Sequence, residues 1–211
     1  MIKLMLADDH AMLREGLRSK FAGHPDMEVV GEAASAKELL TKIATLKPTV
    51  MILDMKLPDA NGVTLIRQIN NALPSCKIVV LTMYDHVRYA VHALESGADG
   101  FVVKGAPFEE LLQAIRTVAG GNTFVSSAMA TKLAGHLKRD GKRKGSLESL
   151  SQREFEVLIL LGNGLSVKEI AYQLGVSEKS VTTYRARVME KLQMANKTDL
   201  IRYAIESGLI E

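Results

Sequence analysis

Five short apolar runs, each followed by a stretch with helical periodicity, occupy about the first 120 residues of this chain. The runs are nearly continuous in apolar character and rich in Val, Ile and Leu, which is typical of parallel strands covered by helices on both faces. The alternation therefore predicts a doubly wound α/β domain. We expect strands at 2–7, 27–33, 49–53, 77–82 and 99–103, and helices at 10–22, 36–46, 62–72, 86–96 and 107–119.

Polar residues stand where these expected strands end. Asp8 and Asp9 follow the first strand, Asp54 follows the third, Thr82 closes the fourth and Lys104 follows the fifth. The carboxyl ends of parallel strands meet at one edge of the sheet, where ligands bind. Three carboxylates so close would repel one another without a hard cation, and Mg²⁺ is the expected ion. With that ion bound, a carboxylate can attack a phosphoryl group whose oxygens are held by an ammonium and a hydroxyl.

Residues 1 to about 121 resemble the receiver domain of two-component response regulators. The resemblance implies a five-stranded parallel sheet of strand order 2-1-3-4-5. It is carried by the acidic pair Asp8-Asp9, by Asp54 in the segment Leu53-Asp54-Met55-Lys56-Leu57-Pro58-Asp59-Ala60-Asn61-Gly62, by Thr82 and by Lys104.

The same resemblance implies a role for each position. Asp54 would be the phosphoacceptor, and Thr82 and Lys104 would complete the catalytic set. Thr82 and Phe101 would form the switch that responds to phosphorylation. The Mg²⁺ ligands would be Asp8, Asp9, Asp54 and the backbone carbonyl of Lys56.

Two positions depart from the pattern of many receivers. Phe101 stands where a switch Tyr or Phe is found, and it cannot donate a hydroxyl hydrogen bond. Gly105 replaces the proline that is common after the lysine, so no cis-proline is implied there. Pro107 is instead expected in the first turn of the last helix, a favourable place for proline.

Simpler interpretations exist for several of these residues. A pair of Asp residues after a strand is often only a helix cap, and it gains specificity here from Asp54, Thr82 and Lys104. Asp59 and Asn61 are expected to be turn and cap residues rather than ligands. His10, next to the acidic pair, is expected to be a surface residue, and we leave it out of the predicted site.

From Ser149 onward the pattern changes to helices alone. Two capping boxes, Ser151 with Glu154 and Ser166 with Glu169, predict two helix starts. A turn at Gly175 and caps at Ser177 and near Asn196 predict two more helices. Four short helices with a tight turn between the second and third form the helix-turn-helix layout.

The third of these helices is the expected recognition helix. At about 100° per residue its core side carries Val181, Tyr184, Val188 and Leu192. The exposed side would enter the major groove, with Thr side chains at base edges and cations on phosphates, although a solvated face of an ordinary helical domain remains the alternative. The predicted DNA-binding residues are Lys179, Thr182, Thr183, Arg185, Arg187 and Lys191.

Residues 148 to 210 resemble the LuxR/FixJ-type helix-turn-helix. Receiver and output together resemble the NarL/FixJ class of transcriptional regulators, in which the fourth helix contacts its copy in the DNA-bound dimer. The resemblance is carried by Leu150–Glu154, Glu169–Ala171, Val176–Val181 through Leu192, and Lys197–Leu200. The implied dimer residues are Asp199, Leu200, Ile201, Ala204 and Ile205.

The net charge of +3, from 27 basic and 24 acidic residues, is unevenly placed. Residues 1–128 carry −1, residues 129–150 carry +4 and residues 151–211 carry none. The basic core at 138–145 holds two glycines and no large apolar residue, which is typical of a linker. We therefore expect a receiver at 1–121, a helix and basic linker at 122–147 and a DNA-binding domain at 148–211.

Composition supports a globular protein, with 47% hydrophobic and 24% charged residues. A single cysteine, Cys76, argues for a reducing compartment. No apolar stretch approaches the ~18 residues of a membrane span, and no leader pattern opens the sequence. A cytoplasmic location without membrane contact is therefore expected.

These features together predict a DNA-binding regulator that is controlled by Mg²⁺-dependent phosphorylation and is not an enzyme. The expected partners are a sensor histidine kinase, double-stranded promoter DNA, a second copy of the chain in a homodimer, and RNA polymerase. One alternative is a phosphatase that works through an aspartyl phosphate, but Lys56 occupies the place of its acid/base. The other is a regulator that works without phosphorylation.

Overall fold

The computed structural model describes residues 1–138, 147–207, 209 and 210. These residues group into two units, which are Met1–Met83 with Ala90–Lys132, and Tyr84–Tyr89 with the chain from Leu133 onward. Most of the predicted basic linker, at 139–146, lies outside the described residues. No helix in the described part of the chain is long and apolar enough to cross a bilayer.

A parallel sheet forms the centre of the first unit. Its strands are β1 (Ile2–Ala7), β2 (Met27–Ala33), β3 (Val50–Leu53), β6 (Lys77–Thr82), β7 (Gly100–Val103) and β8 (Phe124–Val125). Their order is β2-β1-β3-β6-β7-β8, and every neighbouring pair is parallel. The first five positions match the predicted order 2-1-3-4-5, so the doubly wound sheet is confirmed. The edge strand β8 was not predicted.

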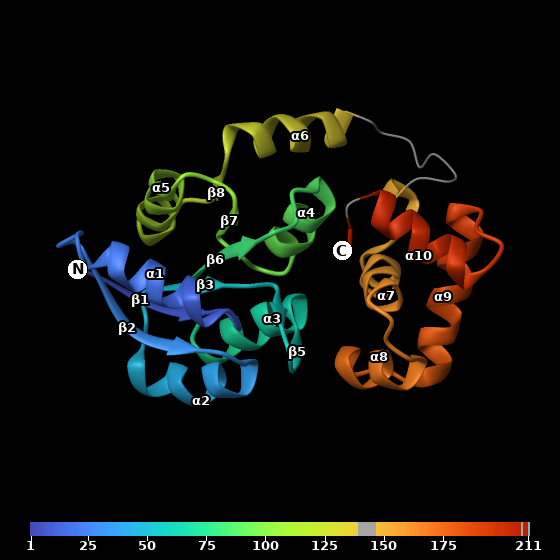
Figure 1. Ribbon diagram of the computed structural model, residues 1–211, viewed down its shortest axis with the longest axis horizontal. Coiled ribbons are helices and arrows are strands. Elements are labelled where there is room, and N and C mark those ends of the chain that lie inside the picture. The colour runs from blue at the N-terminus through green and yellow to red at the C-terminus, as the bar shows by residue number, and fades with distance from the viewer. Residues whose placement is uncertain (139–146, 208, 211) are drawn as a thin grey trace. The chain divides into compact units, whose positions relative to one another are not determined.

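Helices cover both faces of this sheet. Figure 1 shows α1 and α5 on one face and α2 and α3 on the other. The predicted ends are correct to within one residue, except that Pro107 is the N-cap of the last helix, with φ −55° and ψ 146°, rather than part of its first turn. The helices are α1 (Ala11–Phe21), α2 (Ala36–Leu46), α3 (Gly62–Ala72), α4 (Val87–Glu95) and α5 (Phe108–Ala119).

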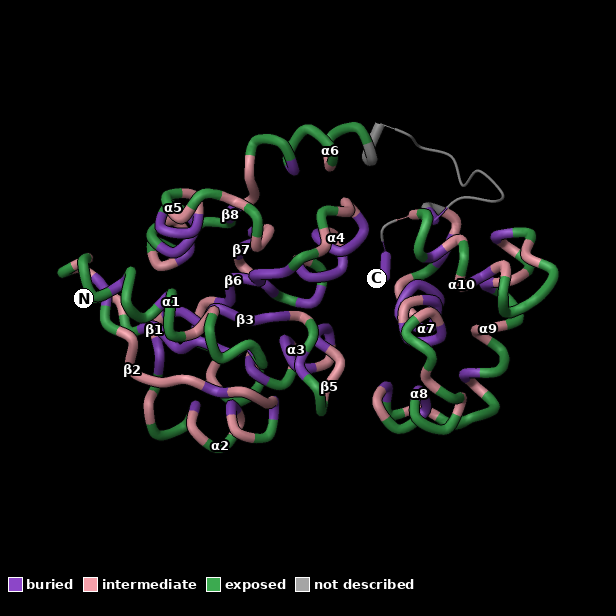
Figure 2. The backbone as a smooth tube through the Cα atoms, viewed as in Figure 1, coloured by how far each residue is buried: buried purple, intermediate pink, exposed green. Residues whose placement is uncertain are grey.

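Alternate residues of the strands point to the same face of the sheet and form the core of the first unit. Leu4 and Leu6 of β1 pack in the cluster that also holds Phe21 of α1 and Ile115 of α5. Figure 2 shows β3 and β6 buried along almost their whole length, as expected for central parallel strands. Because the interiors of these central strands are apolar, their polar side chains stand only at the strand ends.

A small antiparallel hairpin follows Asp54. It consists of β4 (Lys56–Leu57) and β5 (Ala60–Asn61) and was not predicted. The Asn61 side chain accepts hydrogen bonds from the amides of Val63 and Thr64 and so caps α3. Asp59 accepts from the first two amides of α2, at 2.7 and 3.0 Å. Both residues are thus caps, as the sequence predicts.

The second unit is helical. It contains the second half of α6 (Ser127–Lys138), a 3₁₀ turn at Leu147–Ser149, and the helices α7 (Gln152–Gly162), α8 (Val167–Leu174), α9 (Glu178–Leu192) and α10 (Lys197–Glu206). Both predicted capping boxes are present. Gly175 closes the turn between α8 and α9 with φ +63°, a conformation that favours glycine. The predicted four-helix, helix-turn-helix domain is confirmed.

Gly62 is expected to be intolerant of a side chain. A Cβ at this position would lie 2.7 Å from the Met55 carbonyl oxygen and 2.8 Å from its Cα, which are backbone atoms that cannot move aside cheaply. Gly62→Ala should therefore lower the free energy of unfolding by about 1–3 kcal/mol. Urea unfolding of the variant and the parent chain measures the difference.

Gly16 supplies the matched control. It lies inside α1, and no atom stands within 4 Å of the place that an added methyl group would occupy. Gly16→Ala should stabilise the chain by about 0.5–1 kcal/mol, because alanine loses less backbone entropy in a helix. Equal effects of the two substitutions would contradict a close contact at Gly62.

Candidate functional site

Three carboxylates converge where β1 and β3 end, and we name Asp8, Asp9 and Asp54 the acidic edge. The hydrogen bonds between neighbouring strands continue one residue past β1 and β3. The Asp8 amide donates to the Ala33 carbonyl, and the Asp54 amide donates to the Ala7 carbonyl. Asp8 and Asp54 are 5% and 4% exposed, whereas Asp9 is open to solvent. The sheet itself therefore places two buried carboxylates side by side.

A lysine at the end of β7 holds two of these carboxylates. Lys104 Nζ lies 2.7 Å from Asp8 Oδ2 and 2.8 Å from Asp54 Oδ2. Burial alone would lower the pKa of Lys104, but its hydrogen bonds to Asp54 and Asp8 outweigh this effect and raise the pKa above its ordinary value. The group is therefore a charged ammonium at neutral pH, and it offsets part of the repulsion between the two acids.

The other predicted pocket residues lie on the neighbouring strands. Thr82 ends β6 and is fully buried, and its carbonyl accepts a hydrogen bond from the Lys104 amide at 2.7 Å. The Lys56 amide donates to Asp54 Oδ1 at 3.1 Å, which brings the backbone of Lys56 to the acidic edge. Phe101 is 1% exposed and lies in the core beneath this edge.

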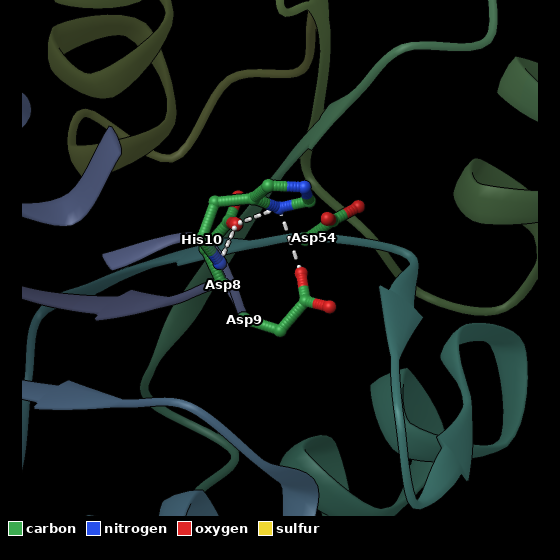
Figure 3. Close-up of side chains that lie close together, drawn as sticks. All are labelled: Asp8, Asp9, His10 and Asp54. Atoms are coloured by element: carbon green, nitrogen blue, oxygen red, sulfur yellow. Dashed lines mark hydrogen bonds and ion pairs between the residues drawn. The ribbon is translucent and has the colours of Figure 1, made fainter. Parts of the chain in front are cut away.

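The donor atoms of the acidic edge fit a divalent cation. One ligand atom from each of Asp8, Asp9, His10 and Asp54 lies within 4.8 Å of the others (Figure 3). Carboxylate oxygens are the ligands that hard divalent ions prefer. His10 was not among the site residues predicted from the sequence. The sequence did hold one indication, because His10 directly follows the acidic pair and its ring is therefore close to both carboxylates.

In the second unit, α9 presents the predicted recognition face. Val181, Val188 and Leu192 are buried, whereas Tyr184 is only partly buried, so its predicted core position is corrected to the edge of the core. Such a place suits a ring with an apolar body and a polar tip. The exposed residues of the predicted set are Lys179, Thr182, Thr183 and Arg187, while Arg185 and Lys191 are partly buried.

The two threonines of α9 use their hydroxyls within the helix. Thr182 Oγ1 donates to the Glu178 carbonyl and Thr183 Oγ1 to the Lys179 carbonyl, both at 2.9 Å. Each hydroxyl hydrogen is thus already engaged four residues back along the chain. The features that these threonines offer to a partner are therefore methyl groups and hydroxyl lone pairs.

Comparison with known proteins decides the family. The model of the response regulator receiver domain matches residues 4–116, and the model of the bacterial regulatory proteins of the luxR family matches residues 148–204. The chain belongs to the response regulators. The resemblance inferred from the acidic edge and the helix-turn-helix is thereby confirmed, and this response regulator carries a LuxR-type DNA-binding domain.

Curated relatives match this response regulator over its whole length. The oxygen regulatory proteins NreC of Staphylococcus haemolyticus and Staphylococcus carnosus are each 37% identical to it, with 100% of both chains covered. Among solved structures, RcsB from Salmonella enterica serovar Typhimurium, bound to promoter rprA with phosphomimetic BeF3⁻, has a TM-score of 0.81. It is 28% identical, and the match covers 96% of this chain and 97% of that one.

Lys191 of this response regulator, predicted to bind DNA, is held by a carboxylate of its own domain. Its Nζ lies 2.6 Å from Glu154 Oε2, and the Glu154 side chain is 3% exposed. Burial alone would raise the pKa of Glu154, but hydrogen bonds from Lys191 and Ser151 outweigh it and leave the pKa below its ordinary value. The pair links α9 to α7 within the helical domain.

The predicted dimer residues on α10 fall into two groups. Leu200 and Ala204 are 1% and 0% exposed and belong to the core of the helical domain, so they are not available to a second copy. Their apolar character suited either role, which is why the sequence alone did not separate them. Ile205 is 51% exposed, while Ile201 and Asp199 are partly exposed, and the dimer contact stays a prediction for these three.

Loss of the Lys191 ammonium should destabilise the DNA-binding domain in a pH-dependent way. Lys191→Met is expected to cost about 1–2 kcal/mol near neutral pH, because it leaves a buried carboxylate without its cation. The folded-state pKa of Glu154 lies below its ordinary value of 4.5, so this contribution is present above that pH and is lost as the pH falls through the folded-state pKa. Hydrogen exchange of the α7 and α9 amides in urea, at about pH 7 and about pH 3, measures it.

The control for this prediction repeats Lys191→Met in a chain that already carries Glu154→Gln. With a neutral amide at 154, Lys191→Met should cost less than about 0.5 kcal/mol, because no buried charge is left behind. A cost that is the same in both backgrounds, or the same at both pH values, would show that Lys191 acts through packing alone.

Proposed function

We propose that this response regulator is switched by Mg²⁺-dependent phosphorylation of Asp54 by a sensor histidine kinase. The observation that carries the proposal is the setting of Asp54. Its Oδ2 is held by the Lys104 ammonium and its Oδ1 by the Lys56 amide, at a buried strand end beside two further carboxylates. A carboxylate fixed in this way is oriented for attack on phosphorus.

The proposed transfer replaces one bond to phosphorus by another. A carboxylate oxygen of Asp54 forms a bond to phosphorus, the phosphorus–nitrogen bond of a kinase phosphohistidine breaks, and the departing imidazole nitrogen takes a proton from water. Asp8, Asp9, Asp54 and the backbone carbonyl of Lys56 would hold Mg²⁺, whose charge stabilises the phosphoryl oxygens. Lys104 would pair with the transferred group and Thr82 would hydrogen-bond to it.

Phosphorylation is proposed to act on the rest of the chain by population shift. The added charge favours the state in which Thr82 and Lys104 close on the phosphoryl group and Phe101 changes its packing. The solved RcsB complex was obtained with the phosphomimetic BeF3⁻ on promoter DNA, which supports a link between the two in a relative. In this chain the consequence would be altered dimerisation or altered domain packing.

The output is proposed to be sequence-specific binding of a homodimer to double-stranded promoter DNA. One solved structure of the relative contains two RcsB dimers bound to two parallel DNAs, which supports this assembly. RNA polymerase is a further proposed partner. We propose that the chain acts in the cytoplasm, which the DNA-binding domain supports.

We further propose that this response regulator does not turn over external substrates. A phosphatase that works through an aspartyl phosphate requires an acid/base two residues after its nucleophile, and that position holds Lys56.

Asp54→Asn is expected to abolish labelling of the receiver by acetyl phosphate in the presence of Mg²⁺, because the amide is a far weaker nucleophile than the carboxylate. Chelation of the metal should abolish labelling of the parent chain as well. Intact-mass spectrometry detects the added phosphoryl group.

The control for this prediction is Asp26→Asn. Asp26 directly precedes β2, at the amino end of that strand, and its carboxylate is paired with Arg116 at 2.9 Å. This variant should still be labelled. Labelling of Asp54→Asn at a comparable level would overturn the assignment of the phosphoacceptor.

On α9, the methyl of Thr183 rather than its hydroxyl is expected to read the DNA, because the hydroxyl donates within the helix. Thr183→Val should therefore keep the base preference of the parent, while Thr183→Ala should relax it by about 1 kcal/mol at one base pair.

Arg187→Ala should weaken binding to all duplexes and reduce the salt slope by about 1. Selection from random duplexes, followed by fluorescence anisotropy at several salt concentrations, measures both effects.

Arg116→Ala is the control for the loss of a basic residue. Arg116 is paired with Asp26 in the receiver and lies outside the DNA-binding domain. Its removal should leave the base preference and the salt slope unchanged. If Thr183→Val relaxes the preference as much as Thr183→Ala, the hydroxyl is the group that reads the base.

A further inference from the structure

We propose that His10 is an additional protein ligand of the divalent-ion site, and that its imidazole makes this site favour a first-row transition ion such as Mn²⁺ over Mg²⁺. The inference rests on the proposed function, since both require an ion on the acidic edge. It differs in assigning a nitrogen donor and an ion preference to the site.

The position of the ring is suited to coordination. His10 Nδ1 lies 3.0 Å from Asp8 Oδ1 and 2.8 Å from Asp9 Oδ1, and Figure 3 shows the ring between these carboxylates and Asp54. Two atoms on neighbouring corners of an octahedron with bonds of about 2.1 Å lie about 3.0 Å apart. The nitrogen thus already stands at ligand spacing from two of the carboxylates.

The local backbone holds the His10 ring beside the carboxylates of Asp8 and Asp9. His10 is the N-cap of α1, where a side chain normally accepts a hydrogen bond from a helix amide, yet its ring makes no such bond. Its backbone amide donates to Asp8 Oδ1 at 2.9 Å, which fixes the start of the side chain beside the acid. The imidazole is therefore directed at the carboxylates rather than at the helix.

The Lys104 ammonium occupies only one oxygen of each buried carboxylate. Lys104 holds Asp8 Oδ2 and Asp54 Oδ2, whereas Asp8 Oδ1 faces the ring. The His10 side chain is 66% exposed, so it can adjust to an ion without disturbing the core.

The donor set determines which ions gain from His10. Carboxylate and carbonyl oxygens suit Mg²⁺ and Mn²⁺ alike, while imidazole suits transition ions. Mg²⁺ dehydrates reluctantly and usually keeps several waters, so it gains little from one nitrogen. A mixed set of oxygens and one nitrogen therefore shifts the preference from Mg²⁺ toward first-row transition ions, among which Mn²⁺ gains the least and so is the most stringent probe.

Mn²⁺ itself is the probe for the test, with the full chain in solution. Pulsed electron paramagnetic resonance should detect nitrogen coupling to the bound Mn²⁺ in the parent chain and in His24→Asn, but not in His10→Asn. His24 is the control because its ring packs against Phe108, away from the acidic edge. Titration should show Mn²⁺ affinity reduced by about tenfold in His10→Asn, with Mg²⁺ affinity changed by less than about twofold.

The possible outcomes separate failure of this inference from failure of the phosphorylation proposal. Bound Mn²⁺ without nitrogen coupling in the parent chain, or an unchanged ratio of Mn²⁺ to Mg²⁺ affinity in His10→Asn, overturns this inference and leaves the phosphorylation proposal intact. Absence of saturable binding of either ion to the parent chain overturns both. His10→Ala, a second variant without polar atoms on the side chain, must reproduce the loss of coupling, and its failure to do so also overturns the inference.

Discussion

The ammonium of Lys104 is the interaction on which the rest of the receiver depends. It lies between two buried carboxylates that belong to different strands, and without it Asp8 and Asp54 would face each other as uncompensated charges. The strand order brings these three groups to one edge, and the apolar strands beneath them exclude water. The carboxylates that repel one another at this edge are the groups that can hold a divalent ion, and the ammonium beside them can pair with a phosphoryl group.

Much of this edge was predictable because its position follows from the regular part of the fold. A parallel sheet collects the ends of its strands, so Asp8, Asp54 and Lys104 could be placed together from their strand positions alone. The parts that were missed are local. The strands at 56–57, 60–61 and 124–125 contain two residues each, too few for a hydrophobic period to be visible.

In the DNA-binding domain, helix starts were predictable and side-chain partners were not. Ser151, Ser166 and Ser177 cap their helices as expected, because capping depends on residues three positions apart. The pairing of Lys191 with Glu154 joins residues that are 37 positions apart, and only the packing of α7 on α9 brings them together. The burial of Leu200 and Ala204 likewise depends on which face of α10 meets its neighbours.

The hydrogen bonds of Asp59 have a consequence for the evolution of such a site. They tie the hairpin that carries Lys56 to the N-terminal amides of α2, a helix that contributes no residue to the acidic edge. The placement of the Lys56 carbonyl, a proposed ion ligand, therefore depends on how the first turn of α2 packs. Sequence drift in that turn can alter the affinity for the ion while every residue of the acidic edge stays the same.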